Sequence, residues 1–426
     1  MAFLLFILVT GTLFVRPGEI IPAMRGWEFF FYFIMPCLLL SFESVARQLS
    51  QRSLRTQPIT VCVLGMLPAV VISNLAHGNI DLAVEQGWSF IKNLIYYFLL
   101  VGLVDRPSRF RGFVFWLWVF CLAFVVLALL QHHGLIELSM EKAVNGSSVS
   151  ESGEQIVTAR MVGSGLFGDP NDMCMVIVTG LILSIYWMGD NLLYAASLPI
   201  FGYGLMQTQS RGGFIAFMAA CGVLLLARYG WKKGAMLLAA GLPALLVVFK
   251  GRMTKISTDE GTAHSRIELW GDGLEFFKSS PLFGIGAGKF HELTDDGHAA
   301  HNAYVQAYAE LGLFGGIFFV GAFYLSLSAI YGMGGTHTEG MDPNIRRAQP
   351  MMMALTAGIA TLMLTLSQTF YMTTYMIFGL ITAYLRITNA AKILLSFRVD
   401  SSLIKRLLVA GILFLAVLFL FVRFFK

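Results

Sequence analysis

The chain has 426 residues, of which 57% are hydrophobic and only 13% are charged, with a net charge of +5. Soluble domains carry about 25% charged residues, so a chain with roughly half that fraction has too little polar surface to face water. The composition therefore excludes an ordinary soluble protein and indicates one embedded in lipid. The sequence contains no basic segment interleaved with aromatic residues, so nothing in it indicates nucleic-acid binding.

Long apolar runs follow one another along the whole chain. A spanning helix needs about 20 mostly apolar residues, so these runs predict about 12 or 13 transmembrane helices. The first run lacks a basic leader and a cleavage site, and we interpret it as a retained span. The five cysteines lie inside apolar runs without CxxC spacing, which predicts neither a disulfide nor a cysteine-bound metal. The runs lie near residues 2–15, 26–42, 58–76, 88–104, 112–131, 171–188, 191–207, 213–228, 234–250, 303–330, 349–366, 371–388 and 407–423.

Lysines and arginines gather after alternate runs, and this bias orients membrane helices. Basic clusters follow the second, fourth, eighth, tenth and twelfth runs, so all lie on one side if the N-terminus is cytoplasmic. We expect one membrane domain over residues 1–426, with extracytoplasmic loops at 132–170 and 251–302. The clusters contain Arg47, Arg52, Arg55, Arg106, Arg109, Arg111, Arg228, Lys232, Lys233, Arg346, Arg347, Lys392, Arg398, Lys405 and Arg406.

The second outer loop has an internal pattern of its own. Apolar residues recur at helical spacing from Ser265 to Lys278, which predicts an amphipathic helix against the membrane surface or the bundle. Pro281 and the glycines that follow predict a tight loop. A long apolar helix then enters the membrane from about His301 onward.

Three ionisable residues lie at predicted membrane boundaries: Arg211, Arg266 and His301. An arginine beside hydrocarbon either snorkels to the interface or meets a counter-charge, and Arg266 is equally compatible with a solvated helix face. At the start of a membrane helix, the positive end of the helix dipole disfavours imidazolium at His301. A neutral histidine can act as a general base.

Together these residues suggest a reaction. Two guanidinium groups can hold a diphosphate through charge-assisted hydrogen bonds and stabilise the charge that departs with it. A neutral imidazole can take the proton from an acceptor hydroxyl. A sugar that already carries a pyrophosphate needs no nucleotide, and arginines can replace a divalent metal, so we expect no cofactor.

The motifs around these residues resemble the O-antigen ligase and polymerase superfamily of bacterial membrane glycosyltransferases. His301-Asn302, nine residues, and Gly312-Leu313-Phe314-Gly315 fit the ligase pattern H-[NSQ]-x9-G-x-x-G. Ser210-Arg211-Gly212 matches the Ser-Arg-Gly motif of the family. Arg266 precedes Pro281-Leu-Phe-Gly-Ile-Gly-Ala-Gly288, which fits P-[LIV]-x-G-x-G-x-G. The specific motifs cover about 205–316.

The resemblance implies an all-helical fold akin to the GT-C class, located in the bacterial cytoplasmic membrane with its site facing outward. Arg211 and Arg266 would engage an undecaprenyl-pyrophosphate-linked glycan, and His301 would act on a glycan or glycolipid acceptor in an inverting, metal-independent transfer. We expect further substrate contacts from Ser210, Asn302, Gly286 and Gly288.

Members that act as ligases often carry two threonines after the last glycine of the motif. Here Gly316 and Ile317 follow it, which weakens the case for a lipid A core acceptor. The residues do not separate a ligase from a polymerase.

Other interpretations start from the same residues. A transporter or flippase that moves polysaccharide or lipid without glycosyl transfer is the alternative function, although transporters usually carry ionisable groups at midspan. The run Gly284-x-Gly-x-Gly288-Lys289 lacks the Lys-Ser/Thr pair of a phosphate-binding loop. A metal site is a third possibility, built from His291, Glu292, Asp295, Asp296, His298 and His301.

Overall fold

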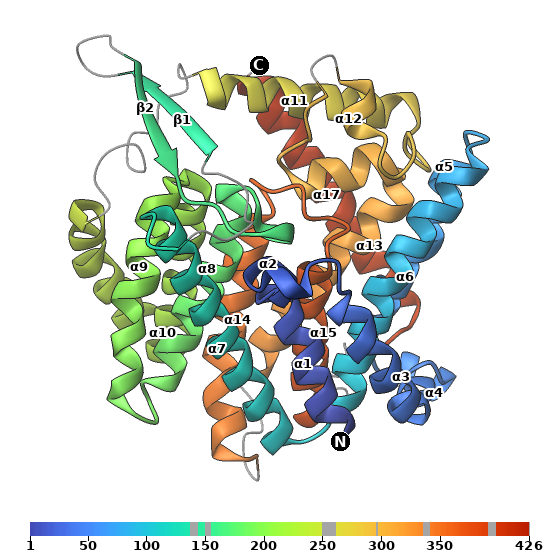
Figure 1. Cartoon of the computed structure of the whole chain (residues 1–426). Helices are drawn as coiled ribbons and strands as arrows, with labels where there is room; N and C mark the ends of the chain where they lie inside the picture. Colours follow the sequence, from blue (N-terminus) through green and yellow to red (C-terminus); the bar gives the residue numbers. More distant parts are fainter. Residues whose placement is uncertain are drawn as a thin grey trace. The chain divides into compact units, whose positions relative to one another are not determined.

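The computed structural model describes residues 1–136, 144–149, 155–248, 261–294, 297–334, 341–390 and 398–425. Helices dominate these residues (Figure 1), as the sequence predicts for an all-helical membrane protein. The longer helices are α1 (Ala2–Phe14), α3 (Phe29–Gln48), α5 (Pro58–Leu75), α6 (Ile80–Leu103), α7 (Pro107–His132), α8 (Pro170–Trp187), α9 (Ser197–Thr208), α10 (Arg211–Val248), α11 (Gly261–Ser279), α13 (Ala303–Met333), α14 (Pro343–Leu362), α15 (Met372–Ile387) and α17 (Ser401–Phe425). Short turns of helix are α2 (Pro17–Ile20), η1 (Pro22–Met24), α4 (Gln51–Leu54), η2 (Gly165–Phe167), η3 (Leu192–Ala196) and α12 (Phe290–Leu293).

Seven helices among the described residues are long and apolar enough to cross a membrane, and two shorter apolar helices, α1 and α15, accompany them. The chain is therefore a multi-pass membrane protein. The predicted number of spans is larger because it also counts the shorter helices, and α6 and α14, which are long enough but less apolar. The seven are α3, α5, α7, α8, the part of α10 from Arg211 to Gly241, α13 and α17.

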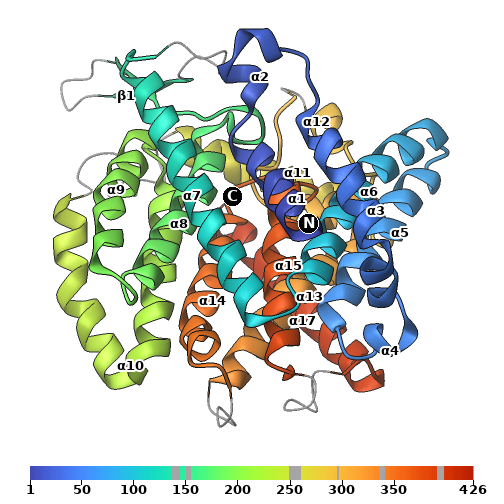
Figure 2. The same cartoon turned by 60° about the horizontal axis from the view of Figure 1, so that its bottom comes forward.

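The element α10 contains two of the predicted runs. Its backbone leaves the helical region at Gly230, where φ is 76° and ψ is 171°. The chain folds back there, since a Cβ at Gly234 would lie 2.9 Å from the Leu225 oxygen and one at Gly222 would contact Leu238. Figures 1 and 2 show the two arms side by side. The predicted runs 213–228 and 234–250 are thus the arms of one helical hairpin.

A two-stranded antiparallel sheet lies in the first predicted outer loop. Strand β1 (Val144–Val149) pairs with β2 (Gln155–Arg160), with Val144 opposite Arg160. The sequence predicts only a loop rich in Ser, Gly and Glu here, because the short polar strands lack the apolar alternation by which strands are recognised.

The described chain divides into two compact units, each built from three separated segments. Unit 1 contains Met1–Leu40, Pro107–Ile256 and Asp342–Leu362, and unit 2 contains Ser41–Arg106, Ser257–Met341 and Met363–Lys426. The sequence predicts one membrane domain, and contiguous apolar runs give no indication of this division. The two units are described separately below.

Unit 1 has a cluster of charged side chains at one end of its helices. Asp190, just after α8, accepts from Arg111 at 3.1 Å and from Arg347 at 2.7 Å, which joins the first turns of α7 and α14. At the other end of α8, Asn171 contacts Ser210, the residue before Arg211. The 18 residues of α8 are about 27 Å long at 1.5 Å per residue. Arg211 and the Asp190 cluster therefore lie a membrane thickness apart.

Unit 2, taken by itself, also has basic residues at one end of its helices and predicted site residues at the other. Helix α5 begins at Pro58 beside Arg52 and Arg55, and ends where Asn74 contacts the glycine-rich loop at Ala287. Aromatic side chains pack against one another inside unit 2, for example Phe90 with Tyr375. A buried chain of hydroxyl groups lies beside them, in which Tyr97 forms hydrogen bonds with Thr60 at 2.8 Å and with Thr382 at 2.9 Å. The basic residues named here, Arg111 and Arg347 in unit 1 and Arg52 and Arg55 in unit 2, therefore lie at the helix ends opposite the predicted site residues.

Candidate functional site

A break in α13 explains the glycines of the motif that begins at His301. Gly312 has φ 65° and ψ −162°, a region that essentially only glycine adopts. The break frees backbone groups on both sides. The carbonyls of Ala309 and Glu310 accept from Ile285 and Gly286 at 2.9 and 3.0 Å.

Backbone groups on the far side of the break also bond to the same loop. Leu313 and Phe314, just after the break, donate their backbone N–H groups to Pro281 and Leu282 at 2.8 and 3.2 Å. A Cβ at Gly284 would overlap the Glu310 carbonyl, and one at Gly312 would lie 2.5 Å from the Gly284 nitrogen. The two predicted glycine motifs are therefore the two halves of one backbone junction, and small residues are needed on both sides.

The other two glycines of the loop face α5 and α6. An added Cβ would lie 2.6 Å from Asn74 Oδ1 at Gly286 and 3.1 Å from Gln86 Nε2 at Gly288. Both have positive φ, 110° and 84°. These contacts give the two residues a structural role, and the expectation that they bind substrate stays a prediction.

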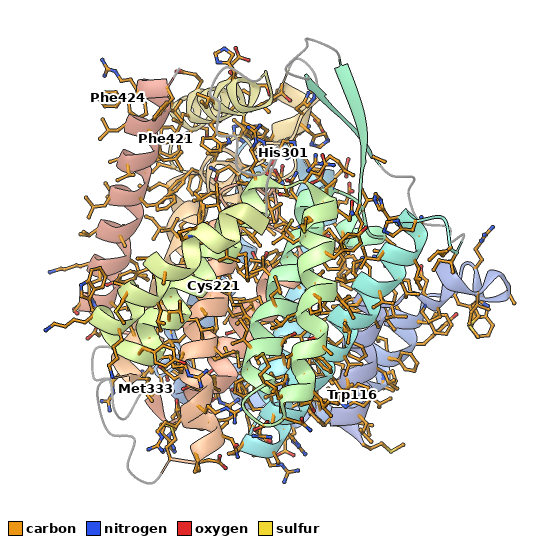
Figure 3. All side chains as sticks on the ribbon, turned by 90° about the vertical axis from the view of Figure 1, so that its left-hand side faces the viewer. Trp116, Cys221, His301, Met333, Phe421 and Phe424 are labelled. Carbon is orange, nitrogen blue, oxygen red and sulfur yellow. The ribbon has the colours of Figure 1, made fainter. Side chains whose placement is uncertain are left out.

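His301 lies immediately before α13 in a left-handed backbone conformation with φ 45°. Such conformations are uncommon outside glycine, although histidine adopts them more often than most residues. The His301 N–H donates to Ser367 Oγ at 2.8 Å, and its side chain is half-buried. Figure 3 shows His301 at the end of α13 opposite Met333, at the same end of unit 2 as Phe421 and Phe424 of α17.

Asn302 is the N-cap of α13. Its Oδ1 accepts from the backbone N–H groups of Tyr304 and Val305 at 3.0 and 3.1 Å, and the residue is 1% exposed. A cap of this kind fixes where the helix begins and so fixes the backbone of the residue before it. Asn302 therefore holds His301 through the backbone, and the expected contact of Asn302 with substrate stays a prediction.

The segment between α14 and α15 supports the same turn, a part of the site that the sequence did not indicate. Met363 O accepts from the Ala303 N–H at 2.8 Å, and Thr369 Oγ1 donates to the Ala303 carbonyl at 2.8 Å. The Thr369 carbonyl in turn accepts from Tyr375 at 2.9 Å. This segment is short and mixed in polarity, so only its hydrogen bonds identify it.

The predicted amphipathic helix is α11, and it packs closely on the start of α13. The indole N–H of Trp270 donates to the Ala300 carbonyl at 3.1 Å, directly before His301. A Cβ at Gly273 would overlap Val305, so the two helices touch. Arg266 lies one helical turn before Trp270 in α11, and its role in the site stays a prediction.

Glu310 is the buried acidic residue of this region, 1% exposed within the apolar helix α13. Its Oε1 accepts from the Phe290 N–H at 3.0 Å, which ties α12 to α13. The predicted site residues lie at membrane boundaries and do not include Glu310. Its position as a single acidic residue within an apolar run is the sequence feature that would have indicated it.

Arg211, in unit 1, begins the first arm of α10, and Ser210 caps it. Ser210 Oγ donates to Asn171 Oδ1 at 2.7 Å and accepts from the Gly213 N–H at 3.1 Å, and the residue is 1% exposed. Both contacts of this hydroxyl belong to the fold, so the expectation that Ser210 binds substrate stays a prediction. A Cβ at Gly213 would overlap Cys174, so the third residue of α10 must be small.

Two further arginines lie at this end of unit 1. Arg160, at the end of β2, donates through Nε to the Thr208 carbonyl at 2.9 Å, close to Arg211 in sequence. A Cβ at Gly165 would overlap the Arg16 guanidinium. The end of unit 1 that carries Arg211 therefore holds two further arginines, together with Asp169, which caps α8 beside Asn171.

The alternative metal site depends on residues that are only partly described. Within the described ranges, no group of three or more His, Cys, Asp or Glu side chains is placed to hold a metal ion. Asp295 and Asp296 lie outside those ranges. Glu292 instead pairs with Lys289 at 2.5 Å, a hydrogen bond that lowers the pKa of the Glu292 carboxyl.

Part of the chain matches a known protein family. Residues 194–320 match the family model described as O-antigen ligase. This part of the chain is similar to the O-antigen ligase superfamily. No match was found among curated proteins.

The matched residues include Arg211, Arg266 and His301, together with the glycine loop and the break at Gly312. The match supports a role in glycan transfer during polysaccharide assembly. The resemblance inferred from the sequence motifs is thus confirmed.

Proposed function

We propose that the protein transfers an undecaprenyl-pyrophosphate-linked glycan to an acceptor sugar or lipid on the outer face of the cytoplasmic membrane. The observation that carries this proposal is the hydrogen bond from Trp270 to Ala300. It joins the helix that bears Arg266 to the turn that bears His301, which supports a site in which a cation and a potential base act on the same substrate.

The proposed chemistry uses these residues as follows. The acceptor hydroxyl attacks the anomeric carbon from the face opposite the pyrophosphate, and its proton passes to His301. The bond from the anomeric carbon to the pyrophosphate oxygen breaks, and undecaprenyl pyrophosphate leaves with the electron pair. Arg211 and Arg266 bind the diphosphate and stabilise the charge that develops on it. Attack from the opposite face inverts the anomeric configuration.

The distribution of charge supports the proposed outward orientation. The basic clusters of each unit lie a helix length from its predicted site residues, and basic loops face the cytoplasm in membrane proteins. The side on which Arg211 and His301 lie is then the side away from cytoplasmic nucleotides, where a pre-activated lipid-linked donor is needed.

The test replaces Arg211, Arg266 and His301 singly and measures transfer from a defined lipid-linked donor in detergent. We expect Arg211→Lys and Arg266→Lys to lower the rate about 10²- to 10³-fold, as for loss of one transition-state hydrogen-bond donor. His301→Ala should lower it about 10²- to 10⁴-fold, as for loss of a general base.

Two residues of α11 serve as matched controls. His264 is an exposed histidine that pairs with Glu268 at 3.3 Å, and Lys278 is an exposed cation that pairs with Glu275 at 2.7 Å. His264→Ala and Lys278→Gln should keep near wild-type activity. Wild-type transfer by all three site variants would refute the proposal. A His301→Ala protein that still moves the lipid-linked glycan across vesicles, while wild type makes no transfer product, would favour a transporter.

A further inference from the structure

A polar cavity lies in unit 2, at the end of the helices away from His301. Its volume is about 570 Å³, and it is bounded by the end of α3, α4, the start of α5 and the end of α15. Three arginines line it, Arg47, Arg52 and Arg386, and its lining among the described residues includes no acidic side chain, although Asp105 is near enough to act on the charge of Arg386.

The distance from the His301 region follows from two independent helices. Helix α15 begins just after the segment that holds His301 and runs 16 residues to the cavity. Helix α5 runs the opposite way over 18 residues, from the cavity at Gln57 and Ile59 to Asn74 at the glycine loop. Both lengths correspond to about 24–27 Å at 1.5 Å per residue. Figures 1 and 2 show α4 and α11–α12 at opposite ends of unit 2.

The wall of the cavity is held by a continuous hydrogen-bond network. Gln57 Nε2 donates to Ser53 Oγ at 2.7 Å, and Gln57 Oε1 accepts from Thr60 at 3.1 Å. Thr60 continues through Tyr97 to Thr382, which itself lines the cavity. The polar groups are therefore fixed before any ligand arrives, which lowers the entropy cost of binding.

The three arginines have different settings. Arg386 is half-buried, and its Nη1 donates to the Val101 carbonyl, so its guanidinium is anchored at the inner side of the cavity. Arg47 and Arg52 are exposed at the rim, and Arg47 meets Glu43 at 3.6 Å outside the lining. The cavity thus combines one anchored cation with two exposed ones around hydroxyl and amide groups.

We propose that this cavity binds a phosphate group, supplied either by the headgroup of an anionic phospholipid or by a soluble phosphate ester. Several guanidinium forks in one cavity match the oxygens of a phosphate better than a single carboxylate. Basic pockets at the cytoplasmic ends of membrane helices meet the leaflet that carries anionic lipid. The ligand would join α4, α5 and α15, and hence the two helices that reach the His301 region.

The experiment measures binding to the purified full chain by native mass spectrometry. The probes are short-chain phosphatidylglycerol, short-chain phosphatidylcholine and inorganic phosphate, and the variants are Arg47→Gln/Arg52→Gln and Arg52→Glu. Each cation near a lipid phosphate contributes roughly fivefold in affinity, so the double variant should bind phosphatidylglycerol about thirtyfold more weakly. Arg52→Glu should weaken it at least as much, because it reverses the charge.

Arg106→Gln is the matched control, since Arg106 is an exposed arginine of unit 2 at the same helix ends but outside the lining. It should bind as wild type does. Preference for phosphatidylglycerol over inorganic phosphate identifies a lipid, whereas displacement of the lipid by millimolar phosphate identifies a soluble ester. Equal binding by wild type and both cavity variants, or an equal loss in Arg106→Gln, would overturn the proposal. Both rim arginines are exposed, so the variants should fold, and a melting curve checks this.

Discussion

Replacement of Gly312 by alanine tests the backbone junction that underlies both glycine motifs. The residue has φ 65° and ψ −162°, which costs a non-glycine residue about 1–3 kcal/mol. The new Cβ would also lie 2.5 Å from the Gly284 nitrogen and from the Leu282 oxygen. Both are backbone atoms, so the clash cannot be relieved by a rotamer change.

The hydrogen bonds next to Gly312 determine the largest loss of stability that the substitution can cause. Four backbone bonds cross the junction, and a typical bond contributes about 1 kcal/mol net. If the alanine separates the loop from α13, we expect a loss of about 3–6 kcal/mol in the free energy of unfolding. At about 2 °C per kcal/mol, the midpoint of thermal unfolding should fall by about 6–12 °C.

The assay is thermal unfolding of the purified protein in detergent, with glycan transfer measured on the same samples. Gly202→Ala is the control, because Gly202 lies within α9 and a Cβ there meets no atom within 4 Å. This control should be neutral or stabilising by about 0.5–1 kcal/mol, since alanine favours the helix. A Gly312→Ala protein as stable as Gly202→Ala would refute the account of the junction.

Three further changes test the turn at His301. Asn302→Ala should lose about 1 kcal/mol of stability and most transfer activity, whereas Asn302→Ser should retain both, because serine also caps helices and the Asn302 Nδ2 makes no hydrogen bond to the described residues. Trp270→Phe removes the bond to Ala300 but keeps a ring; we expect about tenfold slower transfer with less than about 1.5 kcal/mol lost, and a change confined to stability would contradict the positioning role. Transfer in excess EDTA should equal that in buffer, and loss restored by a divalent metal would instead support the metal site.

The sequence predicted the local features of the site well. Periodic apolar residues located the amphipathic helix within Gly261–Ser279, and hydropathy located α13 from about His301 onward. Both signals depend only on which residues face lipid and which face water. The spacing of apolar and polar residues along the chain determines this. The roles of Arg211, Arg266 and His301 remain predictions.

The capping and glycine positions were harder to interpret. The family resemblance assigns Asn302, Ser210 and Gly286 to substrate binding, which stays a prediction, and their described contacts hold the backbone. Capping residues are polar for the same reason that binding residues are, so residue type alone does not separate the two roles.

Composition and hydropathy by themselves determined that this chain is an all-helical, multi-pass membrane protein, because transfer of each segment into lipid depends on that segment alone. Only the tertiary structure decided that Gly284 meets Gly312, that Ser367 holds His301, and that Arg386 joins Arg47 and Arg52 around one cavity. These contacts join residues from about 30 to more than 300 positions apart, and they form only when helices pack, which no local pattern records.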